Sequence, residues 1–241
     1  MPDIIVKNLT VSYQNVKKVK VTVIDNLSVT FPKGKISVII GASGGGKTTL
    51  LKVISGIQPI DGGDILFDDA VVNYLPPKDR NLSYVNQELV LYPKMNVFHN
   101  IAFPLEVQDV PVDEIRHRVN DVAELFGLVP LLTRKIKELS IGQAQRVLLA
   151  KAMIKKPTLF LFDEPFSNLD KPLSHKLTQE LRKIFMKNED TVIFISHDIN
   201  DAIAIADYIY VMEEGKIIES GDPREVLKSK NAKVKEYFKD L

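Results

Sequence analysis

The sequence predicts an α/β fold: a parallel sheet forms the core, an antiparallel β part precedes it, and a helical part is inserted into it. Near-continuous apolar runs, Thr158–Asp163 and Thr191–Ser196, are typical of parallel strands covered by helices on both faces. Two partly alternating β-branched stretches, Ile4–Tyr13 and Val21–Phe31, indicate two further strands near the N-terminus. Between Val97 and Lys156 the apolar residues instead recur at the three- and four-residue spacing of helices.

Composition limits the class of protein. The chain has 241 residues, 45% of them hydrophobic, which suits one large domain or a domain with a smaller lobe. Its 32 basic and 31 acidic residues give a net charge of +1, so we expect no nucleic-acid partner. It has no cysteine, which excludes disulfides and thiolate metal sites. We find neither a secretory signal nor an apolar run near the roughly 20 residues that cross a bilayer, and we expect a soluble chain that reaches membranes through a partner.

The shorter elements follow from local signals. The polar insert Gln14–Lys20 is expected to form an exposed hairpin tip, and Gly127 is expected to end a helix. Asp222 is the predicted N-cap of a helix that has Pro223 at its first position. The charged stretch Lys228–Leu241 is expected to form a solvated helix. The remaining expected turns are Pro32–Lys35 and Asp61–Asp64. The remaining expected strands are Ile36–Ile40, Ile65–Phe67, Leu82–Val85, Tyr208–Met212 and Lys216–Glu219.

A glycine-rich stretch, Gly41–Thr49, lies between the apolar run Ile36–Ile40 and a helical pattern that continues to Ser55. It has the spacing G-x-x-x-x-G-K-[ST] of a phosphate-binding loop. In such a loop the backbone N–H groups and the helix N-terminus bind phosphates, the lysine reaches the terminal phosphates, and the threonine hydroxyl binds Mg²⁺. The sequence therefore predicts a P-loop NTPase core. The expected nucleotide-binding residues are Gly41, Ser43, Gly44, Gly46, Lys47, Thr48 and Thr49, with Thr48 also a metal ligand.

Two carboxylates, Asp163 and Glu164, end the apolar run that begins at Thr158. Ligands of open parallel sheets bind at the carboxyl ends of the strands, so both acids are expected beside the phosphate loop. Asp163 is the expected Mg²⁺ ligand, through water, and Glu164 the expected general base for an attacking water. The alternative is a pair of residues that only cap a helix. Gln87 and His197 also follow strands, but each alone is a weak signal.

The segment Leu139–Gln143 makes a specific resemblance visible. It reads L-S-I-G-Q, and the chain resembles an ABC-type ATPase, whose signature loop is L-S-G-G-Q, over almost its whole length. The order of the other motifs agrees with that family. They are Tyr13, the phosphate loop, Gln87, the signature, Asp163–Glu164, Ser167–Asp170 and His197.

The resemblance implies roles for residues within one subunit. Tyr13 would stack on adenine, and its alternative is a packing aromatic at a strand end. Gln87 would touch Mg²⁺ or the attacking water and respond to a membrane partner. His197 would contact the γ-phosphate and orient Glu164.

It also implies a second subunit. Ser140, Gly142 and Gln143 of the signature would bind ATP held by another copy, so each site is completed by head-to-tail dimerisation. Asp170 would lie at that dimer interface, unless it is a simple turn residue.

Four positions depart from the family pattern. Ile141 replaces the first signature glycine and adds a β-branched side chain where the backbone approaches phosphate, which could slow hydrolysis or loosen the dimer. Ala144 stands where a polar or basic residue is usual. In the phosphate loop, Ala42 stands where proline is common and Gly45 where serine is common.

Three segments, Pro76–Arg80, Leu91–Val97 and Asn100–Leu105, resemble importer ATPases for sugars and related solutes. Those proteins usually have a C-terminal regulatory domain, for which we expect no room here, and the insert after Tyr13 is longer than theirs. We expect a single ABC ATPase domain over 1–241, with its nucleotide-binding core in 1–87 and 157–241 and its helical part in 88–156.

The expected function is an ATP-hydrolysing subunit that uses ATP and Mg²⁺, dimerises on ATP and powers solute import through a membrane permease. Its expected partners are integral permease subunits, a second ATPase subunit and, for an importer, a substrate-binding protein. Its expected location is cytoplasmic, peripheral on the inner face of the cell membrane. The alternatives are an exporter cassette, a soluble ABC ATPase acting on DNA or ribosomes, a P-loop kinase, and a cassette that only binds nucleotide.

Overall fold

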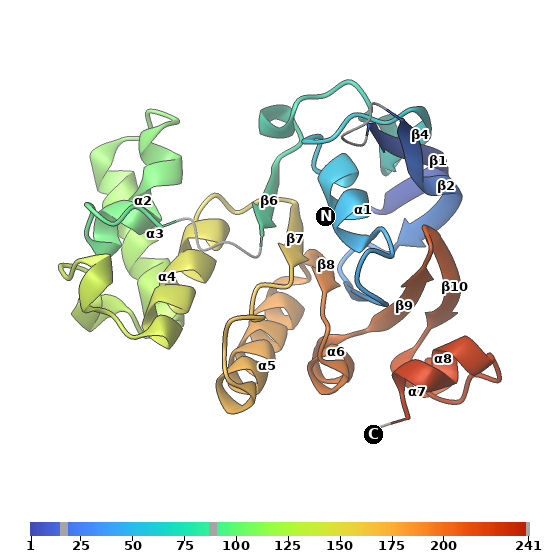
Figure 1. Ribbon diagram of the computed structural model, residues 1–241. Coiled ribbons are helices and arrows are strands. Elements are labelled where there is room, and N and C mark those ends of the chain that lie inside the picture. Colours follow the sequence, from blue (N-terminus) through green and yellow to red (C-terminus); the bar gives the residue numbers. More distant parts are fainter. Residues whose placement is uncertain (15–18, 87–90, 240–241) are drawn as a thin grey trace.

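The computed structural model describes residues 1–14, 19–86 and 91–239, and within them it contains two sheets with helix α1 (Lys47–Ile54) between them (Figure 1). One sheet has the strand order β10-β9-β3-β8-β7-β6, and all its pairs are parallel except β9–β10. The other is antiparallel, with the order β2-β1-β4-β5. The predicted α/β class, with an antiparallel part near the N-terminus, is confirmed.

The strands are β1 (Ile4–Gln14), β2 (Lys20–Phe31), β3 (Ile36–Ile40), β4 (Gly62–Phe67), β5 (Ala70–Val71), β6 (Leu82–Val85), β7 (Leu159–Asp163), β8 (Thr191–Ile195), β9 (Tyr208–Glu213) and β10 (Lys216–Gly221). Besides α1, the α-helices are α2 (Val97–Glu106), α3 (Val112–Leu125), α4 (Ile141–Met153), α5 (Lys171–Asn188), α6 (Ile199–Ile205), α7 (Pro223–Val226) and α8 (Ala232–Tyr237). Short 3-10 turns occupy Pro77–Asp79, Val129–Leu131 and Ile136–Glu138.

Strand β7 shows why the parallel strands are apolar throughout. Successive side chains of a strand point to opposite faces of the sheet. Leu159 and Leu161 belong to the core that contains α1, whereas Phe160 and Phe162 belong to the core on the other face. There both rings contact Phe185 of α5. Since both faces are covered, no position of the strand is left for a polar residue until Asp163.

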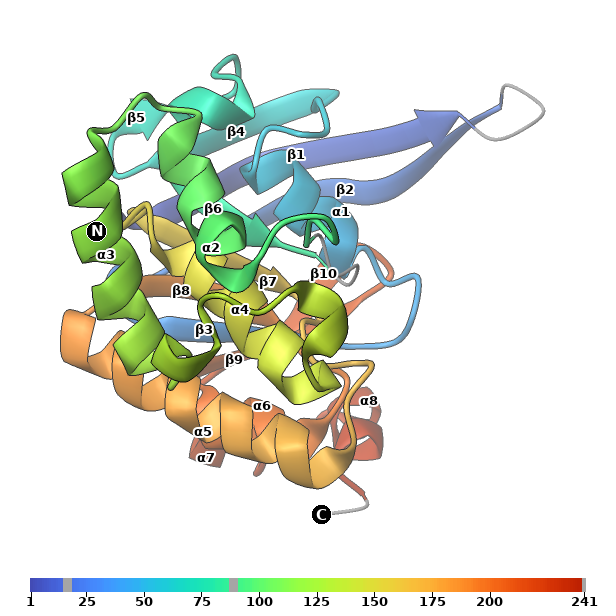
Figure 2. The same ribbon diagram turned by 90° about the vertical axis from the view of Figure 1, so that its left-hand side faces the viewer.

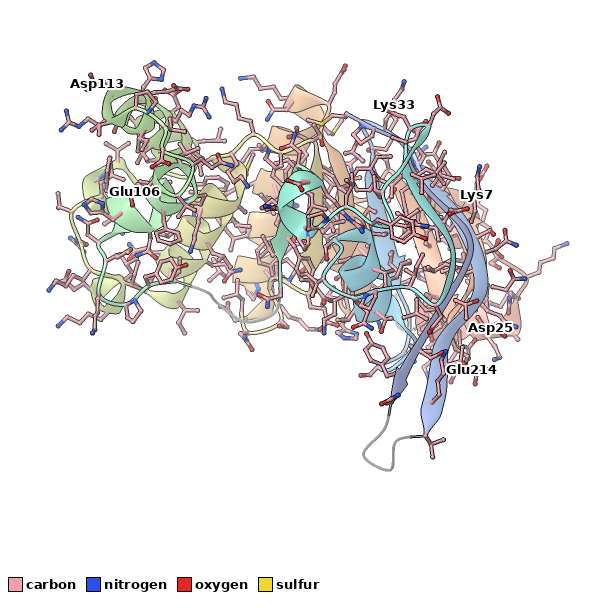
Figure 3. All side chains as sticks on the ribbon, turned by 90° about the horizontal axis from the view of Figure 1, so that it is seen from above. Lys7, Asp25, Lys33, Glu106, Asp113 and Glu214 are labelled. Atoms are coloured by element: carbon pink, nitrogen blue, oxygen red, sulfur yellow. The ribbon has the colours of Figure 1, made fainter. Side chains whose placement is uncertain are left out.

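Helices α2, α3 and α4 pack on one another at one end of the molecule, on the left in Figure 1. Their apolar residues at helical spacing, among them Ile101, Val119 and Val147, are fully buried. Figure 3 shows Glu106 and Asp113 at this end and Lys7 and Asp25 at the opposite, β-rich end. The predicted helical character of 97–156 is confirmed, and Gly127, with φ of +64°, follows the end of α3.

Strands β1 and β2 form the predicted antiparallel pair, with Gln14 opposite Lys20. The pair projects beyond the rest of the fold in Figure 2. Residues 15–18 of the expected hairpin tip lie outside the described residues. The expected turn at Asp61–Asp64 is wrong in part, because β4 already begins at Gly62. Gly63 has φ of +87°, and a Cβ there would lie 2.4 Å from the carbonyl oxygen of Lys7, so the glycine is what allows this close strand pairing.

The prediction of a solvated helix after Lys228 is also wrong in part, because one face of that helix is buried. Helix α8 buries Val234 completely, and Tyr237 and Phe238 pack, half-buried, against the larger core. The N-cap of α7 is as predicted, since the Asp222 carboxylate accepts a hydrogen bond from the backbone N–H of Arg224.

Across the described ranges 1–14, 19–86 and 91–239, none of the helices is both long enough and apolar enough to cross a bilayer.

Candidate functional site

Three adjacent strands of the parallel sheet deliver the predicted site residues to one edge. Strand β3 leads into the phosphate loop, its neighbour β8 leads to His197, and β7, next to β8, ends at Asp163. Because these strands are parallel, their carboxyl ends lie side by side. The strand order therefore brings together residues more than 100 positions apart in the sequence.

The phosphate loop is closed tightly at both ends by glycines. Gly41 has φ of +150°, and a Cβ there would lie 2.0 Å from the carbonyl oxygen of Met212 on β9, so no larger residue fits. Gly46 is the N-cap of α1 with φ of +97°, in the left-handed region that favours glycine. The loop thereby passes directly into the N-terminus of α1, whose free N–H groups suit an anion.

Lys47 lies inside the loop, and only 4% of its surface is exposed. Its ammonium group donates hydrogen bonds to the carbonyl oxygens of Gly41 and Ala42, at 2.8 and 2.7 Å. Burial lowers the pKa of Lys47, while the charges of Glu164 and Asp163 act in the opposite direction. The lysine is thus a desolvated cation at the centre of the loop, facing two carboxylates.

A cavity of about 300 Å³ opens above the loop. Its lining unites most of the predicted phosphate residues with Glu164 and adds Val23 of β2, which the sequence did not single out. The lining residues are Val23, Ser43, Gly44, Gly46, Lys47, Thr48, Thr49 and Glu164. Val23 carries no local signal of this role, because β2 belongs to the other sheet and contacts α1 only through the packing of the two sheets.

Asp163 is held by two hydroxyl groups. Thr48 Oγ1 donates to Asp163 Oδ1 and Tyr84 Oη donates to Asp163 Oδ2, both at 3.0 Å. A hydroxyl and a carboxylate at this distance fit Mg²⁺, which takes few protein oxygens and completes its shell with water and phosphate. The described residues contain no cluster of three or more His, Cys, Asp or Glu that could hold a metal by itself. Tyr84 was not predicted, and burial, followed by the Asp163 charge, raises the pKa of its phenol.

Glu164 and His197 form a pair at the same edge. Glu164 Oε1 lies 2.5 Å from His197 Nε2, and the Glu164 side chain is the more buried of the two. Glu164 adopts φ of +52°, unusual for a non-glycine residue, and its backbone N–H donates to the carbonyl oxygen of Ile195 at the end of β8. Non-glycine residues in this region of φ often occur at functional sites.

A second cavity, of about 590 Å³, lies on the other side of Glu164. Glu164 and His197 line it together with Ser167, Leu169 and Lys171 of the segment before and at the start of α5. Glu164 therefore lines both cavities, and the second one also includes Ser167 and Leu169 of the predicted motif Ser167–Asp170. Asp170 is the exposed N-cap residue of α5.

The predicted residue Tyr13 is not among the described residues that line the phosphate cavity. The hydroxyl of Tyr13 donates to Thr49 Oγ1 at 3.4 Å, so Tyr13 lies against the phosphate-loop helix. Gln87 lies outside the described residues.

The signature segment begins α4. Ser140 is the N-cap, its hydroxyl accepts from the Gln143 N–H, and the Gln143 side chain accepts from the Ser140 N–H, which is a capping box. Ile141 at the first helical position is 65% exposed. A Cβ on Gly142 would lie 2.9 Å from Leu173 of α5. The described lining of the phosphate cavity includes none of these residues, and α4 lies beside α2 and α3 rather than α1 in Figure 1.

Comparison with known proteins agrees with this geometry. A family model described as "ABC transporter" matches residues 24–167. The chain is 43% identical over 213 residues to the trehalose/maltose import ATP-binding protein MalK of Thermococcus litoralis, covering 86% of this chain and 57% of MalK. It is 40% identical over 220 residues to the sn-glycerol-3-phosphate import ATP-binding protein UgpC of Bordetella pertussis, covering 90% of this chain and 61% of UgpC. The chain thus spans about 60% of the length of these relatives.

A solved structure of a dimeric bacterial ABC transporter cassette, MJ0796, superposes with a TM-score of 0.80 at 27% identity, covering 92% of this chain and 99% of that one. A post-hydrolysis structure of the same cassette with ADP and phosphate gives the same TM-score. Sequence, family model and fold agree, and the chain belongs to the ABC transporter family.

Proposed function

We propose that this chain is an ATP-hydrolysing subunit that dimerises on ATP and powers the import of sugar-like or other small solutes through a membrane permease. The observation that carries the proposal is the single cavity in which Lys47, Thr48 and Glu164 meet, with Asp163 hydrogen-bonded to Thr48 beside it. A phosphate-binding loop, a metal-binding pair and a base candidate are together the requirements for hydrolysis of a nucleoside triphosphate.

In this proposal the loop holds the phosphates through its backbone N–H groups, and Lys47 exchanges its two carbonyl partners for phosphate oxygens. Thr48 and Asp163 would hold Mg²⁺, which neutralises charge on the phosphates. Tyr13, which lies against the loop helix, would stack on adenine. The proposed contact of Gln87 with the metal or the attacking water rests on the family resemblance.

Glu164 is the proposed general base. Its carboxylate lines the phosphate cavity, and a carboxylate there can accept a proton from a water that attacks the γ-phosphate. His197, 2.5 Å from Glu164, would hold that carboxylate in place and contact the γ-phosphate. The histidine is half-exposed and lines the second cavity together with Glu164.

A second subunit is proposed to complete each site. Ser140, Gly142 and Gln143 begin a helix in the lobe away from their own phosphate loop, and a helix N-terminus suits the phosphates of a nucleotide held by another copy. Asp170, exposed beside the larger cavity, would lie at the interface. The similar cassette MJ0796 was solved as a dimer, which supports this arrangement.

The transport role is proposed from the relatives, which are import ATP-binding proteins for trehalose/maltose and for sn-glycerol-3-phosphate. The expected partners are integral permease subunits and a substrate-binding protein, and the expected location is the cytoplasmic face of the cell membrane. Reconstitution with the permease in vesicles tests this role: solute with its binding protein should stimulate hydrolysis, and an unresponsive ATPase would contradict the import assignment.

The hydrolytic role is tested with Glu164→Gln, which keeps the shape of the side chain but removes the base. We expect turnover to fall by about 10²-fold or more, and light scattering to show an ATP-dependent dimer. Glu124→Gln, an exposed position on α3, is the matched control and should behave as wild type. A Glu164→Gln protein with near wild-type turnover would remove Glu164 from the base role.

A further inference from the structure

Helix α8 reaches the phosphate loop from the far end of the sequence. The backbone N–H of Ala42 donates a hydrogen bond to the hydroxyl oxygen of Tyr237, 2.9 Å away and 195 residues later. Tyr237 is the last residue of α8. No role in nucleotide binding was predicted for it, because the charged stretch around it suggested a solvated helix.

The hydroxyl of Tyr237 is held in place by the packing of α8. Val234 is completely buried, and the ring of Tyr237 and the neighbouring Phe238 pack against the larger core. The Asn231 side chain caps the helix by accepting from the Lys233 N–H. A buried valine contributes about 1.5–3 kcal/mol, so the helix is anchored by its apolar face. Its tyrosine therefore meets the loop in a defined position.

Glu213 links α8 to the turn between β9 and β10, and this turn contacts the phosphate loop. The Lys233 ammonium group lies 2.9 Å from Glu213 Oε1 at the end of β9. Two residues later, the Gly215 N–H donates to the carbonyl oxygen of Gly45 in the loop, at 3.0 Å. We call Glu213, Gly215, Lys233 and Tyr237 the loop clamp. It contacts the phosphate loop at two points, Ala42 and Gly45.

Ala42 is the point at which the clamp meets the phosphate-binding groups. Its N–H is bonded to Tyr237, and its carbonyl oxygen accepts from the Lys47 ammonium group at 2.7 Å and from the Gly45 N–H at 3.2 Å. Movement of this one residue would therefore displace the first turn of the loop and a carbonyl that holds Lys47 in the loop before phosphate binds. A proline at position 42 has no N–H and could not bond to Tyr237.

We propose that Tyr237 is a positioning residue for nucleotide binding, which holds the phosphate loop in its binding conformation through Ala42. The inference rests on the proposed use of the loop for ATP. A loop held in its bound shape loses less conformational freedom when the ligand arrives, so the hydroxyl raises affinity without touching the nucleotide. Because the Tyr237 hydroxyl does not contact the reacting atoms, the rate of the chemical step should be unaffected.

The test replaces Tyr237 by phenylalanine, which keeps the packed ring and removes only the hydroxyl. Loss of one neutral hydrogen bond should weaken ADP binding, measured by calorimetry, and raise KM for ATP by about 2- to 10-fold, with kcat unchanged. Tyr74→Phe, at a tyrosine that is 96% exposed, is the matched control and should leave KM, kcat and ADP affinity at wild-type values.

Ala42→Pro removes the donor of the same hydrogen bond and gives an independent measurement. Since proline also fixes φ at position 42 and restricts Gly41, the informative comparison is within the Ala42→Pro background: adding Tyr237→Phe there should not weaken ADP binding further, because the bond is already absent. Additive effects would show that the two residues act separately. A Tyr237→Phe protein with wild-type ADP affinity and KM would overturn the inference.

Two outcomes separate this inference from the proposed function. If the wild-type protein neither binds nor hydrolyses ATP, the proposed function fails and the clamp has no nucleotide to act on. If the wild type hydrolyses ATP but Tyr237→Phe matches it, only the clamp fails. A purely structural role is recognised by a lower melting temperature with unchanged affinity of the folded protein.

Discussion

Tyr84 donates a hydrogen bond to Asp163 Oδ2 at 3.0 Å, on the side of the carboxylate opposite to Thr48. The two residues come from neighbouring parallel strands, β6 and β7, in which Tyr84 pairs with Leu161. Because burial raises the pKa of the Tyr84 phenol, it stays protonated and remains a donor at neutral pH. The proposed metal ligand is therefore oriented by a tyrosine as well as by the phosphate loop.

Replacing Tyr84 by phenylalanine should weaken Mg²⁺ binding. Partners that orient a ligating carboxylate are worth roughly 10- to 100-fold in metal affinity, and we expect the lower end here because Thr48 still holds Asp163. The measurement is ATPase activity as a function of free Mg²⁺ at saturating ATP. Tyr208→Phe on β9 is the control. An unchanged Mg²⁺ dependence would show that Tyr84 only packs.

Arg80 should be a major stabilising residue of the nucleotide-binding helix. It is buried, and its guanidinium group donates to the carbonyl oxygens of Val53 and Ile54 at the end of α1, both at 2.8 Å, and to Leu75. Removing it takes away the described donor to the Ile54 carbonyl, leaves Val53 with only the backbone N–H of Gly56, and removes the cation from the negative helix end. For Arg80→Met we expect a loss of about 2–4 kcal/mol in the free energy of unfolding, measured by urea denaturation.

The control for Arg80 is Arg224→Met, at an exposed position of α7, which should change the free energy of unfolding by no more than about 0.5 kcal/mol. If the two variants unfold at the same urea concentration, the carbonyls at the end of α1 must find other partners, and the assignment of Arg80 is wrong.

The sequence predicted the features that are encoded in local patterns of residues. Apolar runs gave the strands of the parallel sheet, and the spacing of Gly41, Lys47 and Thr48 gave the phosphate loop. It did not indicate Val23, Tyr84 or Tyr237, because each reaches the site through the pairing of strands or the docking of a helix far along the chain. Such contacts leave no periodicity or motif in the segments that make them.

Two further differences have physical causes of the same kind. Gly62 and Gly63 were interpreted as a turn, but β1 pairs with that segment so closely that glycine is required within the strand. The charges around Val234 suggested a solvated helix, yet one buried valine and two aromatic residues are enough to dock α8. In both cases a tertiary contact overrode the local preference.

Asp190 should make stability depend on pH. It is buried between α5 and β8, and burial raises its pKa above the ordinary value of 3.8, although Asn188 donates to it. The folded state thus binds the proton more tightly than the unfolded state. Its contribution to stability is complete below pH 3.8 and is lost as the pH rises through the folded pKa. Asp190→Asn should therefore be more stable than wild type at pH 8, by a margin that shrinks toward pH 4.

Thermal unfolding of both proteins across this pH range checks the prediction. Asp25→Asn, at an exposed acidic position of β2, provides the comparison for loss of one surface charge. An Asp190→Asn margin that stays constant with pH would mean that the buried carboxyl does not titrate differently in the two states.

Ile141 is the departure most open to a functional test. Its side chain is 65% exposed at the first position of α4, so it does not pack into the core of its own chain, and in the proposed dimer it would face the partner's nucleotide. If the β-branched side chain keeps the signature away from phosphate, Ile141→Gly should raise ATP turnover several-fold and strengthen the ATP-dependent dimer. Val112→Gly is a close control, because Val112 is 64% exposed at the first position of α3 and loses a similar side chain. Equal turnover of Ile141→Gly and wild type would show that the interface accommodates isoleucine.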